Sequence, residues 1–492
     1  MFLEEYYSNY RSFYGKNIKK LYIYNLMYQL VVLIVPLVTA PYLARVLGAN
    51  GTGLYSYVNS VASLICTFAM LGIFNFGNRQ IAYVRDNLKK LNDTFWQIMS
   101  DRLVITIVGS SIYLVCVVII GKYQIYFLLY YLYLLGYFCD CTWLFVGLED
   151  MKWAVIKNIV MKLMAVVGIF LFVKSKNDVG IYIFIQGASI FFANILAYTQ
   201  LKRYVSKPKL DLTNLKRDLK ASFLLFLPSV ASTLYLQCDK IMIEMLTGMA
   251  NQVSYYDYSE KIITIPLSFI TVLSTVMMPR IANEYKNGNM NRISVLLIKA
   301  GKNSLFLAFP LMFGMISIAD KLIPWYLGND FSPTIMAIYI ISPIIITNTL
   351  SGISGNQYFT ATNQVGILFK AEVFAAIGNI ILNAILIPNY GFVGAAIATL
   401  ASSILCAGIQ YFYLYRQVKL TGLGTAGLKY GLYSILMFFI IRFITRNLGA
   451  TPITNVIQIL LGMGIYFGIC IITKDDQLMD FFRVLNNKLR RN

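Results

Sequence analysis

Residues 41–82 read PYLARVLGANGTGLYSYVNSVASLICTFAMLGIFNFGNRQIA, and a weaker copy of this stretch returns 200 positions later in the chain. The copy, residues 241–282, reads IMIEMLTGMANQVSYYDYSEKIITIPLSFITVLSTVMMPRIA. Gly48 falls on Gly248, and Tyr55 falls on Tyr255. Each copy has an apolar run, a short polar turn, a tyrosine cluster and a second apolar run. Internal repeats of this kind are typical of membrane transporters whose two lobes share one plan.

The composition excludes an ordinary soluble protein. Hydrophobic residues make up 58% of the chain and charged residues only 13%, whereas soluble domains carry about 25% charged residues. The chain also contains many apolar runs long enough to cross about 30 Å of hydrocarbon as a helix. We therefore expect an all-α polytopic membrane protein in which little of the chain forms a soluble domain.

Fourteen runs are predicted to span the membrane, and the basic residues predict how they are oriented. The runs cover residues 20–41, 53–75, 96–120, 124–147, 153–173, 179–200, 221–246, 256–278, 294–319, 332–351, 365–387, 392–415, 425–445 and 453–473. Thirty Lys and Arg residues fall on the side of the two termini and seven on the other side. Because basic residues accumulate in cytoplasmic loops, both termini are expected in the cytoplasm of a bacterial cell. The same bias accounts for most of the net charge of +20 without a nucleic-acid partner.

A second repeat divides the chain in the same way. Residues 179–198 and 393–412 align at an offset of 214, and a Val-Gly pair opens both copies. Six predicted spans separate the two copies, so the lobes should have the same orientation. We expect an N-lobe at 1–210 and a C-lobe at 211–420. Residues 421–492 hold two spans without a repeat partner and a basic cytoplasmic tail.

Signatures of catalysis and of cofactor binding are scarce. The sequence has no G-x-x-x-x-G-K-[ST] loop for a nucleotide. It also has no histidine, no C-x-x-C and no H-E-x-x-H, so a metal site has few ligands to draw on. No catalytic residue, metal site or cofactor is predicted, and the chain is not expected to be an enzyme. Coupling to Na⁺ or H⁺ stays open.

The positive evidence for function is charge inside the membrane, where an ionisable residue is costly unless it meets water or a partner. Five basic residues that the count assigns to neither side lie inside predicted spans: Arg102, Lys162, Lys240, Lys261 and Lys370. Lys162 lies near the centre of its span, too deep to reach the interface easily. It could pair with a carboxylate such as Asp140, or it could contact an anionic substrate. Arg102 could do the same or extend to the cytoplasmic interface.

Two adjacent acid–base pairs, Asp239–Lys240 and Glu260–Lys261, lie near the outer ends of their spans. Neighbouring residues on a helix point about 100° apart, so neither pair is an internal salt bridge. At least one member of each pair should face another helix or a cavity. The acids could bind Na⁺ or exchange a proton, or they could simply neutralise lysines. Arg45, in the turn after the first span, could anchor at the headgroups or line the outer end of a cavity.

Four stretches resemble a known family, the Wzx-type polysaccharide flippases of the multidrug/oligosaccharidyl-lipid/polysaccharide exporter superfamily. PYLARVLGANGTGLYSY at 41–57 resembles the opening signature of that family, and DCTWLFVGLEDMKWAVIKN at 140–158 resembles its turn between spans 4 and 5. CDKIMIEMLTGMANQVSYYDYSEKI at 238–262 is similar to its spans 7 and 8, and NYGFVGAAIATLAS at 389–402 to the start of its span 12. The motifs occur in order over most of the chain.

The resemblance implies fourteen helices in two pseudo-symmetric six-helix lobes around a basic central cavity. It further implies alternating access that moves an undecaprenyl-diphosphate-linked oligosaccharide to the outer leaflet, for assembly of capsule or other surface polysaccharide. Basic side chains would lower the barrier for the diphosphate. The candidate substrate contacts are Arg45, Arg102, Lys162, Lys240 and Lys261, and the candidate ion-coupling residues are Asp140, Asp239 and Glu260.

Several alternatives remain open at the level of sequence. The chain could carry a teichoic-acid precursor or the peptidoglycan lipid for the cell wall, or it could export drugs with the same fold. A protein of another class, a scaffold for membrane glycosyltransferases that transports nothing, also fits. Besides membrane lipids and the lipid-linked glycan, the expected partners are a polysaccharide polymerase and glycosyltransferases, and no nucleic acid is expected.

Overall fold

The structure is a computed structural model that describes residues 18–70, 72–206, 209–480 and 483. Throughout these residues the regular secondary structure is helical, and no strand is present. Eleven helical segments are long and apolar enough to cross a membrane. The protein is therefore a multi-pass, all-α membrane protein, as the composition predicted.

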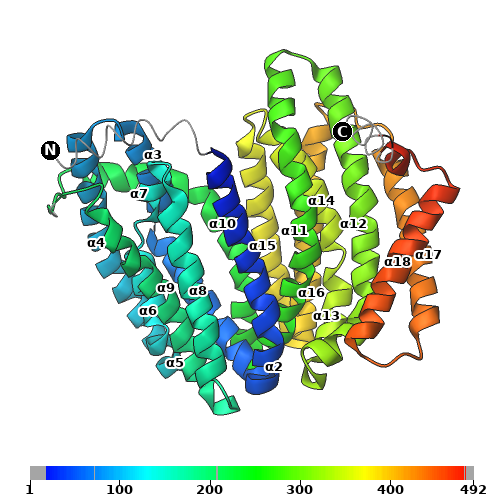
Figure 1. The fold of residues 1–492 in the computed structure, drawn as a ribbon, viewed down its shortest axis with the longest axis horizontal. Coiled ribbons are helices and arrows are strands. Elements are labelled where there is room, and N and C mark those ends of the chain that lie inside the picture. The colour runs from blue at the N-terminus through cyan, green and yellow to red at the C-terminus, as the bar shows by residue number, and fades with distance from the viewer. Residues whose placement is uncertain (1–17, 71, 207–208, 481–482, 484–492) are drawn as a thin grey trace. The chain divides into compact units, whose positions relative to one another are not determined.

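The chain divides into two compact units, Met1–Gln237 and Cys238–Asn492. Unit 1 contains α2 (Ile18–Met70), α3 (Ile73–Val84), α4 (Leu88–Ile120), α5 (Gln124–Leu129), α6 (Tyr131–Phe138), α7 (Thr142–Gly147), α8 (Met151–Phe172), η1 (Lys176–Asp178), α9 (Val179–Leu201) and the first part of α10 (Leu215–Thr247). Within it, α9 packs against α6 and α8, and α2 packs against α4 and α8 (Figure 1). The boundary between the units falls inside α10, whereas the predicted lobes meet before this helix.

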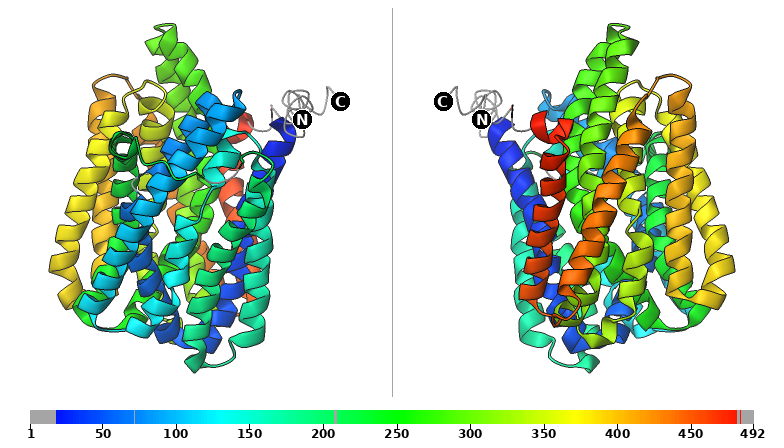
Figure 2. Two further views of the ribbon diagram at one scale, coloured as in Figure 1. Left: turned by 90° about the vertical axis from the view of Figure 1, so that its left-hand side faces the viewer. Right: turned by 90° about the vertical axis from the view of Figure 1, so that its right-hand side faces the viewer.

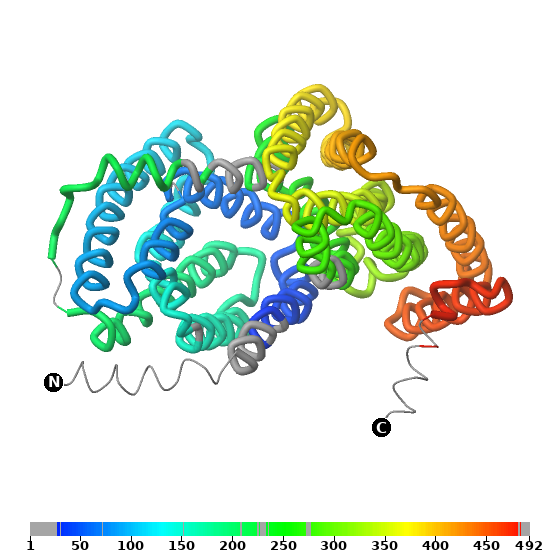
Figure 3. Tube along the Cα trace, turned by 90° about the horizontal axis from the view of Figure 1, so that it is seen from above, coloured from blue at the N-terminus to red at the C-terminus, as the bar shows by residue number. Residues whose placement is uncertain are grey.

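Unit 2 begins in the second part of α10. It continues with α11 (Ala250–Lys286), α12 (Met290–Tyr326), η2 (Asn329–Phe331), α13 (Thr334–Ile341), α14 (Ile344–Ser351), η3 (Gly352–Phe359), α15 (Val365–Tyr390), α16 (Phe392–Tyr415), α17 (Leu423–Thr445) and α18 (Pro452–Ile472). The α15–α16 pair is packed closely, and α17 and α18 pack against each other and against α12. Figure 2 shows the turn between α11 and α12 extending past the ends of α15, α16 and α17. In Figure 3, α17 and α18 form an adjacent pair at the edge of this unit.

Helix α18 has an exposed apolar face and a buried polar face, and the polar face packs against α12 and α17. Ile453 and Leu460 are exposed, whereas Asn455 and Gln458 are buried. Asn455 accepts a hydrogen bond from Trp325 Nε1 on α12 at 2.5 Å, and Gln458 donates to Thr445 on α17 at 3.0 Å. Apolar side chains are tolerated by lipid, but polar ones need partners. The polar face therefore fixes α18 against α12 and α17.

The repeated glycines have nearly the same positive φ in both copies. Gly48 has φ 68° and interrupts α2 between its two apolar halves, and Gly248 has φ 69° between α10 and α11. Positive φ favours glycine because a side chain would clash with the backbone. The predicted turn after the first span is thus reduced to one residue. Arg45, which was predicted in that turn, lies in the helical segment before it.

The described residues of the predicted spans lie mostly on helices, and three spans are interrupted. The span predicted at 53–75 ends in α3, after a break at Gly72, and the span predicted at 332–351 is divided into α13 and α14. The predicted span 124–147 is divided into α5, α6 and α7, and the last break comes at Asp140, whose Oδ1 accepts a hydrogen bond from Thr142 N at 2.8 Å. The span predicted at 332–351 continues into η3, a π-helix of eight residues. Because α10 and α11 are not among the eleven candidate membrane helices, the count of fourteen stays a prediction.

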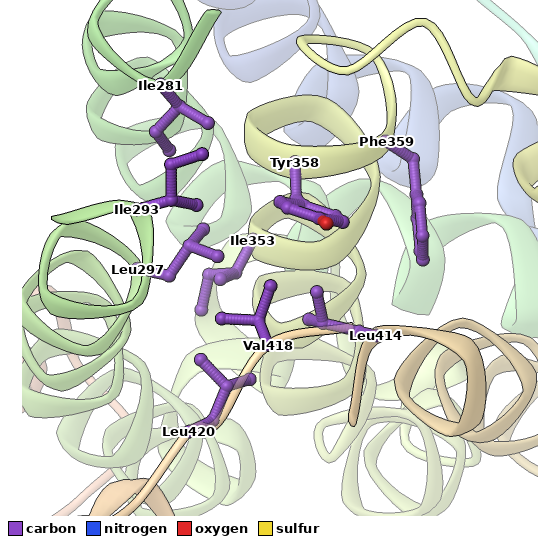
Figure 4. Packing of buried hydrophobic residues seen from close by; sticks show 9 residues of the cluster. All are labelled: Ile281, Ile293, Leu297, Ile353, Tyr358, Phe359, Leu414, Val418 and Leu420. Carbon is purple, nitrogen blue, oxygen red and sulfur yellow. The ribbon is translucent and has the colours of Figure 1, made fainter. Parts of the chain in front are cut away.

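An apolar cluster surrounds η3 (Figure 4). It joins side chains of α11, α12, η3 and α16 to the segment that follows α16: Ile281, Ile293, Leu297, Ile353, Tyr358, Phe359, Leu414, Val418 and Leu420. Two polar contacts bind η3 to the same region. Ser354 donates to Gln410 at 2.6 Å, and Tyr358 donates to Gln417 at 2.9 Å. Both apolar packing and hydrogen bonds to side-chain amides therefore hold the π-helix.

Candidate functional site

The second part of α10 and the first part of α11 carry a network of four charges. Lys240 Nζ lies 2.9 Å from Glu260 Oε2 and 3.2 Å from Asp257 Oδ1. Lys261 Nζ lies 2.6 Å from the other oxygen of Asp257. The Lys240 side chain is 12% exposed, whereas that of Lys261 is 51% exposed. Asp257 thus joins both lysines, and the network as a whole is electrically neutral.

Asp239 faces away from this network and toward α15 and α16. Its side chain is 1% exposed and accepts hydrogen bonds from Tyr256 at 2.5 Å, Asn383 at 2.5 Å and Thr399 at 2.8 Å. Asn383 also donates to Asn379 at 3.1 Å. Neutral donors therefore surround this buried carboxylate, and no ion pair to a described residue balances its charge. The prediction that adjacent acid and base residues face different partners is confirmed for Asp239 and Lys240.

Arg102 is buried inside unit 1, with 1% of the residue exposed. Its guanidinium donates to the backbone carbonyls of Tyr137 and Asp140 and lies 3.6 Å from the sulfur of Met70. These carbonyls lie at the break between α6 and α7, where the helix leaves acceptors unpaired. Arg102 therefore fastens α4 to that break, and its side chain does not extend to the interface.

Asp140 pairs with Lys157 on α8, since Lys157 Nζ lies 3.9 Å from Asp140 Oδ1. Lys157 is buried and also donates to Asn194 Oδ1 on α9 at 2.5 Å. Asn194 in turn donates to the carbonyl of Gly136 at 2.8 Å. The alternative in which Asp140 neutralises Lys162 is therefore wrong, because Lys157 occupies that role. The count of basic residues on the two sides had assigned Lys157 to the terminus side, although it lies inside the predicted span 153–173.

Lys162 lies one and a half turns further along α8 and is half-buried. Its ammonium makes no hydrogen bond or ion pair with any residue that the structure describes. Arg45 and Lys370 are exposed on α2 and α15. Among the predicted substrate contacts, Arg102 and Lys240 are thus engaged within their own units. Arg45, Lys162 and Lys261 present charge at least partly at the surface of theirs.

The sequence analysis missed several polar residues that complete these groups. Asp257 precedes Lys261 by four positions, a spacing that places both side chains on one helix face. The sequence could therefore have predicted this ion pair. Asn194, Asn383 and Thr399 carry no charge, and their contacts with Lys157 and Asp239 join different helices. No local signal could have identified them.

A multi-pass helical protein that holds several ionisable side chains within its apolar helices has the character of a membrane transporter. Residues 18–284 match the family model described as polysaccharide biosynthesis protein, and residues 154–454 match that of the lipid II flippase MurJ. The first match covers more than half of the 492 residues, and the chain belongs to the polysaccharide biosynthesis protein family. The resemblance to Wzx-type flippases is thereby confirmed.

Individual relatives agree with this assignment. The chain is 25% identical over 390 residues to a putative O-antigen transporter of Escherichia coli K12. The aligned region covers 77% of this chain and 92% of that relative. A structure of the lipid II flippase MurJ in an inward closed conformation is similar in fold, with a TM-score of 0.71 at 20% identity, over 93% of this chain and 99% of that one. An inward-facing MATE transporter of the MOP superfamily has a TM-score of 0.63 at 13% identity, over 80% and 96%.

Proposed function

We propose that the protein is a flippase that moves a lipid-linked oligosaccharide from the inner to the outer leaflet of the cytoplasmic membrane. The carrier is undecaprenyl diphosphate, and the product serves assembly of a cell-surface polysaccharide. Membership of the polysaccharide biosynthesis family supports this proposal, and so does similarity to a protein named as an O-antigen transporter. The protein carries out transport and no catalytic step.

The observation that carries the proposal is the position of Lys162. An ammonium group within an apolar helix costs several kcal/mol unless an anion or water meets it. Lys162 has no partner among the described residues, in contrast to the buried Lys157 and Lys240, which pair with carboxylates. A diphosphate headgroup supplies the missing anion, because ammonium–phosphate hydrogen bonds are strong in a low-dielectric layer. Arg45 and Lys261 are the further candidates to contact the substrate.

Transport takes place by alternating access. The N-lobe at 1–210 and the C-lobe at 211–420 move relative to each other, and residues 421–492 follow the C-lobe because α17 and α18 are bound to α12. Both chain termini lie on the cytoplasmic side. A polysaccharide polymerase and glycosyltransferases are the partners that this activity requires before and after the flipping step.

Asp239 is the best candidate to couple transport to a cation gradient. Asp140 and Glu260, the other two candidates, already have lysine partners. Asp239 has only neutral hydrogen-bond partners, and the hydroxyl oxygens of Tyr256 and Thr399 contact its carboxylate. Such a set of one carboxylate and neutral oxygens suits Na⁺ or a proton better than a divalent metal, which usually takes more carboxylates. When bound, the cation balances the buried charge of Asp239.

The experiment is a leaflet-exchange assay in proteoliposomes. The purified protein is reconstituted with a fluorescent lipid-diphosphate oligosaccharide, and an impermeant quencher reports how fast the label changes leaflet. Lys162→Ala should slow exchange by about tenfold or more, because one charged hydrogen bond to the phosphate is lost. Lys162→Arg should retain most of the rate.

Lys152 provides the matched control, because it lies exposed at the start of the same helix. Lys152→Ala should exchange at the wild-type rate. An unchanged rate in Lys162→Ala would contradict the assignment of this residue, and no exchange by the wild type would favour a scaffold. Running the assay with lipid II in parallel separates an oligosaccharide flippase from a peptidoglycan-lipid flippase, an alternative suggested by the match to the MurJ family.

A further inference from the structure

The segment between α9 and α10 is bound to one face of α4. Asn92 Oδ1 accepts hydrogen bonds from the backbone and hydroxyl of Ser206 at 2.8 and 2.9 Å, and Trp96 Nε1 donates to the Ser206 carbonyl at 3.1 Å. Ser100 accepts from the backbone N–H of Asp211 at 3.0 Å. These three α4 residues are four apart, so they line one face of the helix. We call the described residues of this segment, 202–206 and 209–214, the linker.

Two acids lie buried beside this face, where α4 meets the start of α10. Asp218 is 5% exposed, accepts a hydrogen bond from Gln97 and lies 3.1 Å from Arg217 Nε. Asp101 is 2% exposed, and neither of its carboxylate oxygens has a hydrogen-bond partner among the described residues. Gln97 and Asp101 are four residues apart on α4 and share a helix face, so Asp218, which is bonded to Gln97, lies beside Asp101. Asp218, Asp211 and Arg217 are the charged groups that act on Asp101.

The nearby charges cannot neutralise Asp101. Arg217 is largely exposed and already pairs with Asp218. Asp211 remains an anion, because the hydroxyl and the backbone N–H of Thr213 donate to it and lower the pKa of its carboxyl. A buried carboxylate without a donor is strongly disfavoured, and a second carboxylate beside it disfavours the ionisation of both further. One proton between the two acids removes both penalties.

We propose that Asp101 and Asp218 form a proton-binding site, in which one shared proton joins the start of α10, and with it the linker, to α4. The protonated carboxyl of Asp101 donates to Asp218, which also keeps its contacts with Gln97 and Arg217. Opening the contact exposes both acids to water, where each releases its proton readily. A rise of pH on this side of the membrane therefore favours release of the linker. The proposal is independent of the transported substrate.

The test is limited trypsin digestion of the full-length protein across a pH series. The linker and the start of α10 offer exposed sites such as Lys202 and Lys209. Cleavage there is divided by cleavage after Lys286, in the turn between α11 and α12, to remove the pH dependence of trypsin itself. In the wild type this ratio should rise about tenfold from acidic to alkaline pH, because cleavage follows the population of the open form.

Asp101→Asn should keep the ratio low at every pH, because its amide donates to Asp218 without needing a proton. Asp218→Asn should also keep the ratio low, because its amide can donate to Asp101. If one of the two variants fails to fold, the other still tests the proposal. Asp93→Asn, at an exposed position on the same helix, should respond to pH like the wild type. A pH response in both buried-site variants equal to that of the wild type would overturn the proposal.

Discussion

At the scale of single residues, the sequence located several of the charges inside the helices but did not identify their partners. Asp239, Lys240, Glu260 and Lys261 were singled out because charge is rare inside a membrane helix. The adjacency argument predicted that each pair separates, but it could not tell that Lys240 would turn to α11 while Asp239 turned to α15 and α16. Those partners lie on other helices, so local spacing carries no information about them.

Asp239 gives a prediction that separates a cation site from a structural carboxylate. In the wild-type protein Na⁺ should raise the midpoint of thermal unfolding relative to K⁺, because a ligand that binds only the folded state stabilises it, by about 2.7 kcal/mol at a hundred times its dissociation constant. Asp239→Asn should abolish this difference, since the amide carries no charge. The measurement is thermal unfolding of purified protein in detergent at matched ionic strength.

Asp140→Asn is the control for this prediction, because Asp140 already pairs with Lys157. That variant should retain the response to Na⁺. If the midpoint of the wild type depends on pH but not on Na⁺, and this pH dependence is smaller in Asp239→Asn, the coupling ion is the proton. A full response to Na⁺ in Asp239→Asn would exclude this residue as the Na⁺ site.

At the scale of helices, the long apolar runs were predicted well and the interruptions poorly. Runs such as those at α8, α9, α15 and α16 identify themselves by length and apolar character. The break at Asp140 depends on a side chain that binds its own backbone two residues on, and the π-helix η3 depends on tertiary contacts around it. Neither the break nor the π-helix can be predicted from the hydropathy of the sequence.

Gly48 offers a prediction about the break inside α2. Its φ of 68° with ψ of −179° belongs to a region that only glycine adopts readily. An added Cβ would have space, since its nearest neighbour is Lys176 Cε at 3.9 Å. Gly48→Ala should therefore lower the free energy of unfolding by about 1–3 kcal/mol through backbone strain alone. The loss is measured by denaturant or thermal unfolding of the purified variant.

Asparagine is the informative second substitution at this position. Asn tolerates the left-handed helical region, but the ψ of Gly48 lies outside it. Gly48→Asn should consequently be no more stable than Gly48→Ala. Recovery of wild-type stability by Asn would mean that the break adopts an ordinary left-handed turn.

At the scale of the whole molecule, the two units repeat a local packing arrangement as well as a sequence. Tyr55 packs on Tyr182 of α9 with ring centroids 4.6 Å apart, and Tyr255 packs on Phe392 of α16 at 5.4 Å. α9 and α16 are the two copies of the second repeat. In each unit, therefore, the equivalent tyrosine of the first repeat packs against the helix that carries the second repeat. The sequence offsets of 200 and 214 suggest such a shared plan but do not show this contact.

The membrane topology provides the last prediction, because α10 and α11 are not among the candidate spans. In a cysteine-free background, single cysteines are placed at Lys122, Met249, Asn287 and Asn447, all of which are exposed. An impermeant maleimide added to intact cells should label positions 122, 249 and 447, and it should reach position 287 only after permeabilisation. The basic loops predict this pattern. Labelling at 122 and 447 without labelling at 249 would mean that α10 and α11 do not cross, leaving twelve spans. Labelling at only one of positions 122 and 447 would mean that the number of crossings between them is odd and that the assignment of both termini to the cytoplasm is wrong.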